Sequence, residues 1–183
     1  MNSYLPSTIK QFEYYKSLGD KTIAQLSFEE LKKEFAEDSN SIAIIVKHLA
    51  GNMLSRWTNF LSEDGEKEWR KRDEEFEDTF LSKKDLIKIW DEGWDCLFIA
   101  LKPLSKNDLE QIIYIRNQGH TITEAIHRQM MHYGYHIGQI VFLGKLIKGK
   151  DWQSLSIPKG QSKVYNKTKF ETDKRRRYFT GDL

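Results

Sequence analysis

Apolar residues recur every three or four positions along most of this chain, which is the spacing of one face of an α-helix. The pattern continues over several turns in four separate stretches. These stretches predict long helices at about residues 7–25, 41–60, 83–102 and 121–148. Because such helices bury their apolar stripes against one another, the sequence predicts an all-α fold, an antiparallel four-helix bundle with short connecting elements.

Two capping boxes mark helix starts. Ser27 stands three residues before Glu30, and Thr121 stands three residues before Glu124. In this arrangement the hydroxyl and the carboxylate each accept a hydrogen bond from a backbone N–H group that the helix leaves unpaired. We therefore expect a short helix from Ser27 to about Phe35, and we expect the last long helix to begin after Thr121.

The remaining stretches lack the helical pattern. Residues 62–78 are polar and strongly charged, which predicts a solvated loop. Residues 111–116 are rich in β-branched and aromatic side chains, which favours a short extended segment followed by a turn at residues 117–119. Gly149 is expected to end the last long helix, with coil beyond it.

Charge and hydropathy narrow the function classes. The 183 residues include 29 basic and 27 acidic side chains, a formal net charge of +2, so no nucleic-acid partner is expected. No run of apolar residues is long enough to span a membrane, and no signal peptide is visible. These observations favour a soluble, cytoplasmic protein of one domain.

Two smaller features have simple interpretations. The single cysteine, Cys96, excludes an intramolecular disulfide and is expected to be a buried, inert thiol rather than a catalytic one. The basic run Lys174-Arg-Arg-Arg177 could contact nucleic acid or a membrane surface. A solvated tail is the simpler expectation for four charges at a polar end of the chain.

Histidines supply the strongest chemical signal. His132 and His136 stand four residues apart in the last predicted helix, so they lie about 40° apart on one face. Two imidazoles placed in this way can hold one divalent metal ion. A third ligand is expected from His48, at the edge of the apolar stripe of the second long helix. His127 falls on the outer face and is not expected to join the site.

The same histidines also have a structural interpretation, because inward-facing histidines are often hydrogen-bonded core residues. Asn52 and Arg56 lie on the same helical face as His48, and polar groups beside an apolar stripe need partners. The spacing alone leaves open a three-histidine metal site and a hydrogen-bonded polar cluster. His120 precedes the last helix and is expected to contact the loop there.

Three separated segments are more specific together than any of them alone. They read Lys47-His-Leu-Ala-Gly-Asn-Met-Leu-Ser-Arg-Trp-Thr-Asn-Phe60, His132-Tyr-Gly-Tyr-His-Ile-Gly-Gln-Ile-Val141 and Ser154-Leu-Ser-Ile-Pro-Lys-Gly160. They resemble the DinB/YfiT-like superfamily, a group of candidate metalloenzymes. An uncharacterised subfamily shares the last segment and an Ile-Arg-Gly-like turn, which here reads Ile115-Arg-Asn-Gln-Gly119.

The resemblance covers about residues 5–166. It implies a DinB-like four-helix bundle domain at residues 1–166, often present as a homodimer, and a basic polar tail at residues 167–183. It also implies that the metal ligands are His48, His132 and His136.

The resemblance implies a chemistry as well. Three neutral imidazoles leave a divalent ion, zinc or nickel foremost, with its full charge and an open coordination position, which is typical of catalytic sites. The better understood relatives are thiol S-transferases. They activate a low-molecular-weight thiol, such as bacillithiol, on the metal for attack on an electrophilic substrate. By this analogy Asn52, Arg56 and Gln139 are candidate contacts to the metal ligands or to the substrate.

Two other functions stay open at this point. A metal-dependent hydrolase would use water in place of the thiol, and a non-catalytic stress protein would bind metal or serve a structural role without turnover. Two residue roles are open as well. Arg56 could equally form a salt bridge to a neighbouring helix, and Glu124 is expected to be the capping partner of Thr121 rather than a base.

Overall fold

The computed structural model describes residues 3–178. Its long helices are α1 (Tyr4–Gln25), α3 (Ile42–Trp57), α4 (Lys83–Leu101) and α5 (Ile122–Lys148). The short elements are α2 (Phe28–Leu31), α6 (Ser162–Phe170), the 3₁₀ helices η1 (Asp73–Phe76) and η2 (Gly149–Asp151), and the strands β1 (Ile112–Ile115) and β2 (Gln118–Thr121). The described chain is therefore mostly helical, as the apolar spacing predicted, with one small antiparallel sheet in addition.

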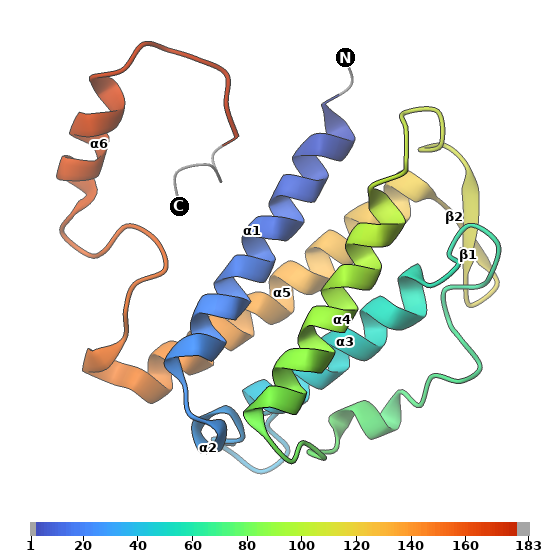
Figure 1. Ribbon diagram of the computed structural model, residues 1–183, viewed down its shortest axis with the longest axis horizontal. Coiled ribbons are helices and arrows are strands. Elements are labelled where there is room, and N and C mark those ends of the chain that lie inside the picture. Colours follow the sequence, from blue (N-terminus) through green and yellow to red (C-terminus); the bar gives the residue numbers. More distant parts are fainter. Residues whose placement is uncertain (1–2, 179–183) are drawn as a thin grey trace.

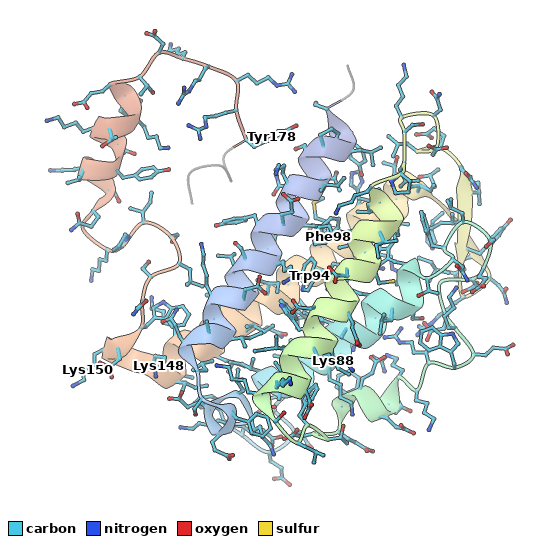
Figure 2. The ribbon with its side chains drawn as sticks, viewed as in Figure 1. Lys88, Trp94, Phe98, Lys148, Lys150 and Tyr178 are labelled. Atoms are coloured by element: carbon cyan, nitrogen blue, oxygen red, sulfur yellow. The ribbon has the colours of Figure 1, made fainter. Side chains whose placement is uncertain are left out.

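The long helices pack against one another through their apolar faces (Figure 1). α3 contacts α4 and α5, and α1 contacts the same two helices. Figure 2 shows Trp94 between the ribbons of α1 and α4. The ring centroid of Tyr133, on α5, lies 5.9 Å from those of both Phe12 and Trp94. Gly93 lets α4 approach α3 closely, since a Cβ there would lie 2.9 Å from the Cα of Ala50.

Side-chain hydroxyls cap the starts of α2, α3, α4 and α5. Both predicted capping boxes are present, at Ser27 and at Thr121, and the four long helices begin and end within a few residues of the predicted positions. The helix after Ser27 ends at Leu31 rather than at about Phe35. The reason is local, because Ser39 Oγ accepts hydrogen bonds from the N–H groups of Phe35 at 3.0 Å and of Ala36 at 3.1 Å. These bonds offer the backbone an alternative to continued helix.

The prediction of a solvated loop at residues 62–78 is wrong for part of the segment, although most of its residues are exposed. Lys67 is 7% exposed and Glu75 is 6% exposed, and η1 lies within the segment. Ser55 of α3 anchors it, since its Oγ donates to Gly65 O at 2.8 Å and accepts from Lys67 N at 3.2 Å. Charged side chains are buried here because they pair with one another, which a charge count does not reveal.

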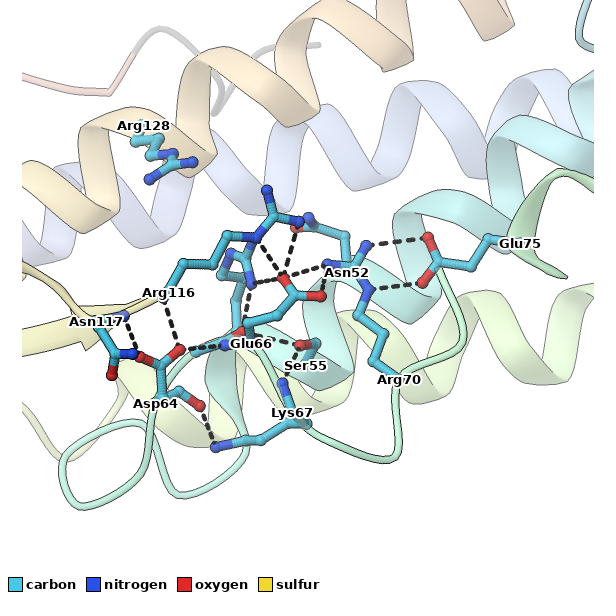
Figure 3. Close-up of polar contacts among 12 residues, drawn as sticks. Asn52, Ser55, Asp64, Glu66, Lys67, Arg70, Glu75, Arg116, Asn117 and Arg128 are labelled. Atoms are coloured by element: carbon cyan, nitrogen blue, oxygen red, sulfur yellow. Dashed lines mark hydrogen bonds and ion pairs between the residues drawn. The ribbon is translucent and has the colours of Figure 1, made fainter. Parts of the chain in front are cut away.

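Strands β1 and β2 form a hairpin whose turn consists of Arg116 and Asn117, rather than residues 117–119 as predicted. Both turn residues have positive φ, 55° and 59°, as in the tight turns that suit a twisted hairpin. The Asp64 carboxylate accepts both of their N–H groups at 2.8 Å (Figure 3). This interaction fixes the hairpin to the segment that follows α3.

Several other expectations concern the termini and the surface. Beyond Gly149 the chain is not coil throughout, because α6 forms there and lies apart from the long helices (Figure 1). α6 crosses residue 166, and the domain boundary at that residue stays a prediction. The basic run at residues 174–177 is exposed. Cys96 is half-buried, and burial raises the pKa of its thiol. Within residues 3–178, no helix has the length and apolarity that a membrane crossing requires.

Candidate metal centre

Three histidines from two helices come together at one place. His48 projects from α3, and His132 and His136 project from consecutive turns of α5. Each offers a ring nitrogen, and these nitrogens all lie within 4.8 Å of one another. The Nε2 atoms of His48 and His132 are 3.3 Å apart. The cluster that the helical spacing predicted is present, and its donor set could hold a metal ion.

The two α5 histidines lie at the edge of the buried face of that helix. The most buried positions are Ile126, Tyr133 and Ile140, each with an exposed fraction of 0%. His132 and His136 are only half-buried. The buried stripe of α5 therefore passes beside the two histidines rather than through them, as had been predicted. Both imidazoles border the core, and His132 also lines a surface cavity.

Hydrogen bonds orient two of the three rings. His48 Nδ1 lies 2.9 Å from Glu75 Oε2, and His136 Nδ1 lies 2.7 Å from Gln139 Oε1. Because both partners are acceptors, each Nδ1 carries the proton and each Nε2 keeps its lone pair. His132 Nδ1 is buried and has no hydrogen-bond partner within the described structure. A histidine that binds a metal typically donates its other ring N–H to a second partner, often a carboxylate, which fixes the ring and raises its basicity. Glu75 and Gln139 occupy this position for His48 and His136.

Glu75 is the residue that sequence reasoning missed. Arg70 holds its carboxylate with two hydrogen bonds, at 2.7 Å to Oε1 and 3.0 Å to Oε2. Burial raises the pKa of Glu75, but the hydrogen bonds from His48 and Arg70 outweigh burial and hold the pKa below its usual value. Gly51, one turn after His48, makes room for this carboxylate, because a Cβ at that position would collide with it. Nothing in the acidic run around Glu75 distinguishes it from its exposed neighbours.

The protonation state of the cluster also suits a metal. The pKa of His132 is lowered to about 3, first by burial and then by the nearby His136 and His48. Burial is also the main cause that lowers the pKa of His136. Both imidazoles are therefore neutral near pH 7, which is the form that binds metal ions.

The three candidate contact residues have different surroundings. Gln139 contacts His136, as described above. Asn52 is buried, and its Oδ1 accepts a hydrogen bond from the Tyr133 hydroxyl at 3.2 Å. Arg56 is buried as well. It donates to Gly65 O and pairs with Glu66 at 2.9 Å, so the salt bridge considered for it is present, but to the loop rather than to a neighbouring helix.

The remaining histidines and Glu124 lie outside the cluster. His127 is exposed and packs edge-on against Tyr4, with ring centroids 5.5 Å apart. His120 belongs to β2, and its Nε2 lies 3.5 Å from Arg128 Nη1. Glu124 accepts from Thr121 N at 2.8 Å, as the capping box requires.

A small cavity adjoins the histidines. Its volume is about 200 Å³, and His48, His132, Asn52, Arg56 and Gln129 contribute to its lining. The Oε1 atom of Gln129 and the Nε atom of Arg56 are buried without hydrogen-bond partners in the described part of the chain. Buried polar atoms nearly always have partners, so two such atoms without one, on side chains that line the same cavity, are unusual.

The comparisons with known proteins agree with the superfamily that the motifs suggested. The model of one family, described as "Protein of unknown function (DUF1572)", matches residues 1–161. That family is in the DinB/YfiT-like superfamily. No curated protein and no solved structure matches the chain.

Proposed function

The chain belongs to the DUF1572 family, and we propose that it is a metal-dependent transferase of the thiol S-transferase type. His48, His132 and His136 would hold one divalent ion, zinc or nickel. The observation that carries the proposal is the convergence of three ring nitrogens within 4.8 Å, from two helices, beside a cavity. Its substrates would be a small-molecule thiol and an electrophile.

The donor set fits such an ion. Two Nδ1 atoms face the acceptors Glu75 and Gln139, so the corresponding Nε2 lone pairs are free to bind a cation. Imidazole is a common ligand of zinc, nickel and copper, and three protein ligands leave room for one exogenous ligand. When bound, the ion would supply Lewis acidity that lowers the pKa of a coordinated thiol or water molecule.

The protein's own groups would position the reaction. Glu75, itself clamped by Arg70, fixes the ring plane of His48, and Gln139 does the same for His136. The unpartnered Arg56 Nε, in the cavity lining, is a donor for a polar group of the substrate. His48, Asn52, Arg56 and Gln129, which line the inner part of the site, are buried, and this limits the water that competes for these interactions.

We also propose how the helices are arranged and how the chains associate. The contacts of α1 and α3 with both α4 and α5 support an antiparallel four-helix bundle within a domain at residues 1–166. The homodimer is supported by large apolar side chains on the outer face of α5. Met131, Tyr135 and Phe142 are 76%, 63% and 67% exposed there, and exposed apolar groups gathered on one face often mark an interaction site.

A thiol-conjugation assay tests the function. Zinc- or nickel-loaded protein is mixed with bacillithiol or cysteine and with monochlorobimane, which becomes fluorescent when a thiolate displaces its halide. We expect a metal-dependent rate above the uncatalysed one that His132→Gln abolishes. His127→Gln, an exposed histidine on the same helix, is the matched control and should keep the rate.

The same preparation separates the alternatives. Hydrolysis of an activated ester without thiol, lost in the His132→Gln variant, would replace the transferase with the hydrolase. Equal rates for wild type and His132→Gln in both assays would contradict catalysis at this site. If the protein binds metal but turns over neither substrate, the result would support the non-catalytic interpretation.

A further inference from the structure

The cavity beside the histidines is lined by five arginines. They are Arg56, Arg70, Arg72, Arg116 and Arg128. Among residues 3–178, no aspartate or glutamate lines it. This concentration of positive charge is local, since the whole chain has a net charge of only +2.

Carboxylates outside the cavity neutralise only part of this charge. Glu66 contacts Arg56 at 2.9 Å. It also contacts Arg70 at 3.2 Å and Arg116 at 3.3 Å, and these two arginines are labelled in Figure 3. Glu75 pairs with Arg70, and Asp73 lies 3.8 Å from Arg72. Five guanidinium groups thus share the ion-paired carboxylates of Glu66, Glu75 and Asp73, and the Asp64 carboxylate lies close enough to Arg56 to interact with it, so arginines still outnumber the carboxylates around them.

Of the five arginines, Arg128 has the least of its positive charge neutralised by nearby carboxylates. It forms no ion pair with a carboxylate among the described residues, and its one polar side-chain contact there is with His120 Nε2 at 3.5 Å. In Figure 3 it extends from α5 toward the group that contains Arg116 and Glu66. Arg128, Arg116 and Arg72 come from three different parts of the chain, and all three are exposed. Their exposed side chains can reach a ligand from the solvent, whereas the side chains of Arg56 and Arg70 are only 6% and 2% exposed.

One further observation indicates that the cavity receives a ligand. The Nε–H of Arg56, whose side chain lines the cavity, is a buried donor with no acceptor among the described residues, and Arg56 is 6% exposed. Buried donors nearly always have a partner, and an acceptor on a bound ligand would supply one.

We propose that the substrate of this site carries a group with at least two negative charges, a phosphate or a pair of carboxylates, which binds to Arg128, Arg116 and Arg72. Guanidinium groups match both anions with paired hydrogen bonds. The cavity of about 200 Å³ fits a small molecule and not a polymer. The inference rests on the proposed function in one respect, because it takes the anion to belong to the molecule that reaches the histidines.

Calorimetric titration tests anion binding without the metal. Metal-free protein at low ionic strength is titrated with inorganic phosphate and, separately, with succinate. We expect saturable binding of at least one of them, weakened tenfold or more in Arg128→Gln and less in Arg128→Lys, which keeps the charge but loses the paired geometry. Arg175→Gln removes the same charge from the exposed tail and should bind as the wild type does.

The outcomes separate the two proposals. Binding of phosphate alone assigns a phosphate group to the substrate, and binding of succinate alone assigns carboxylates. Absence of saturable binding, or equal weakening by Arg128→Gln and Arg175→Gln, would overturn the anion site. Metal titration of the same samples is independent of this result, so a protein that binds zinc but neither anion refutes only the inference.

Discussion

Replacing Glu75 by glutamine probes the support of the metal site without changing any proposed metal ligand. Glu75 is 6% exposed, contacts His48 Nδ1 at 2.9 Å and receives two hydrogen bonds from Arg70. Glutamine has the same shape but no charge, and only one of its two terminal atoms is an acceptor. It therefore cannot accept all three hydrogen bonds from His48 and Arg70 as the carboxylate does, because its amide nitrogen would face a donor at one of the two positions.

These contacts set the expected losses of metal affinity and of folding stability. Loss of a second partner of a metal-binding histidine typically lowers metal affinity by about 10- to 100-fold, or about 1.4–2.7 kcal/mol. Stability should also fall, by about 1–3 kcal/mol, because charge-assisted hydrogen bonds in a buried position are lost. The second effect is limited by Glu66, which still contacts Arg70 at 3.2 Å.

Competition with a zinc-binding dye measures the affinity, and urea unfolding of the metal-free protein measures the stability. Glu74→Gln is the matched control. It makes the same chemical change at the preceding residue, where the side chain is 57% exposed and pairs with Lys71. Equal zinc affinities for Glu75→Gln and wild type, in protein that remains folded, would refute the role assigned to Glu75.

Three further predictions follow from the surroundings of the site. Gly51→Ala should lower zinc affinity in dye competition, because its Cβ displaces the Glu75 carboxylate, whereas Gly138→Ala, with open space around its Cβ, should not. Metal-free protein should become less stable to urea as the pH falls below the ordinary histidine pKa of 6.5, because the unfolded chain then binds a proton that folded His132, with its pKa of about 3, does not. His132→Gln should reduce this loss. Tyr133→Phe should cost about 1–3 kcal/mol in thermal or urea unfolding, since it leaves two buried partners unsatisfied, and should leave zinc affinity unchanged.

Much of the helical structure could be predicted because it depends on local patterns. The apolar spacing and the hydroxyl caps at Ser27, Ser41 and Thr121 act within a few residues of the chain. The turn at Arg116 and Asn117 could not be placed in this way. It depends on the Asp64 carboxylate, more than fifty residues earlier in the chain. The end of α2 was missed for a related reason, a hydrogen-bonding competitor at Ser39.

The residues of the site also fall into those that local patterns predict and those that only the fold brings together. Helical periodicity placed His132 and His136 on one face, and the polar face of α3 singled out His48. Glu75, Arg70 and Arg128 carry no such signal, because their roles arise from contacts between segments that are distant in sequence. A highly charged segment is predicted to be solvated from its composition, whether its charged side chains are exposed to water or buried in ion pairs with one another. Only the fold distinguishes the buried Glu75 from the exposed Glu74.

The most direct test of the central claim is the metal content of the purified, untagged protein, measured beside a His132→Ala/His136→Ala variant. The account predicts about one divalent ion per chain in the wild type, as a three-histidine site implies, and its loss in a variant that keeps its helical circular dichroism. Absence of stoichiometric metal, even after reconstitution with zinc or nickel, would contradict it. The histidines would then be a hydrogen-bonded cluster beside an arginine-lined cavity.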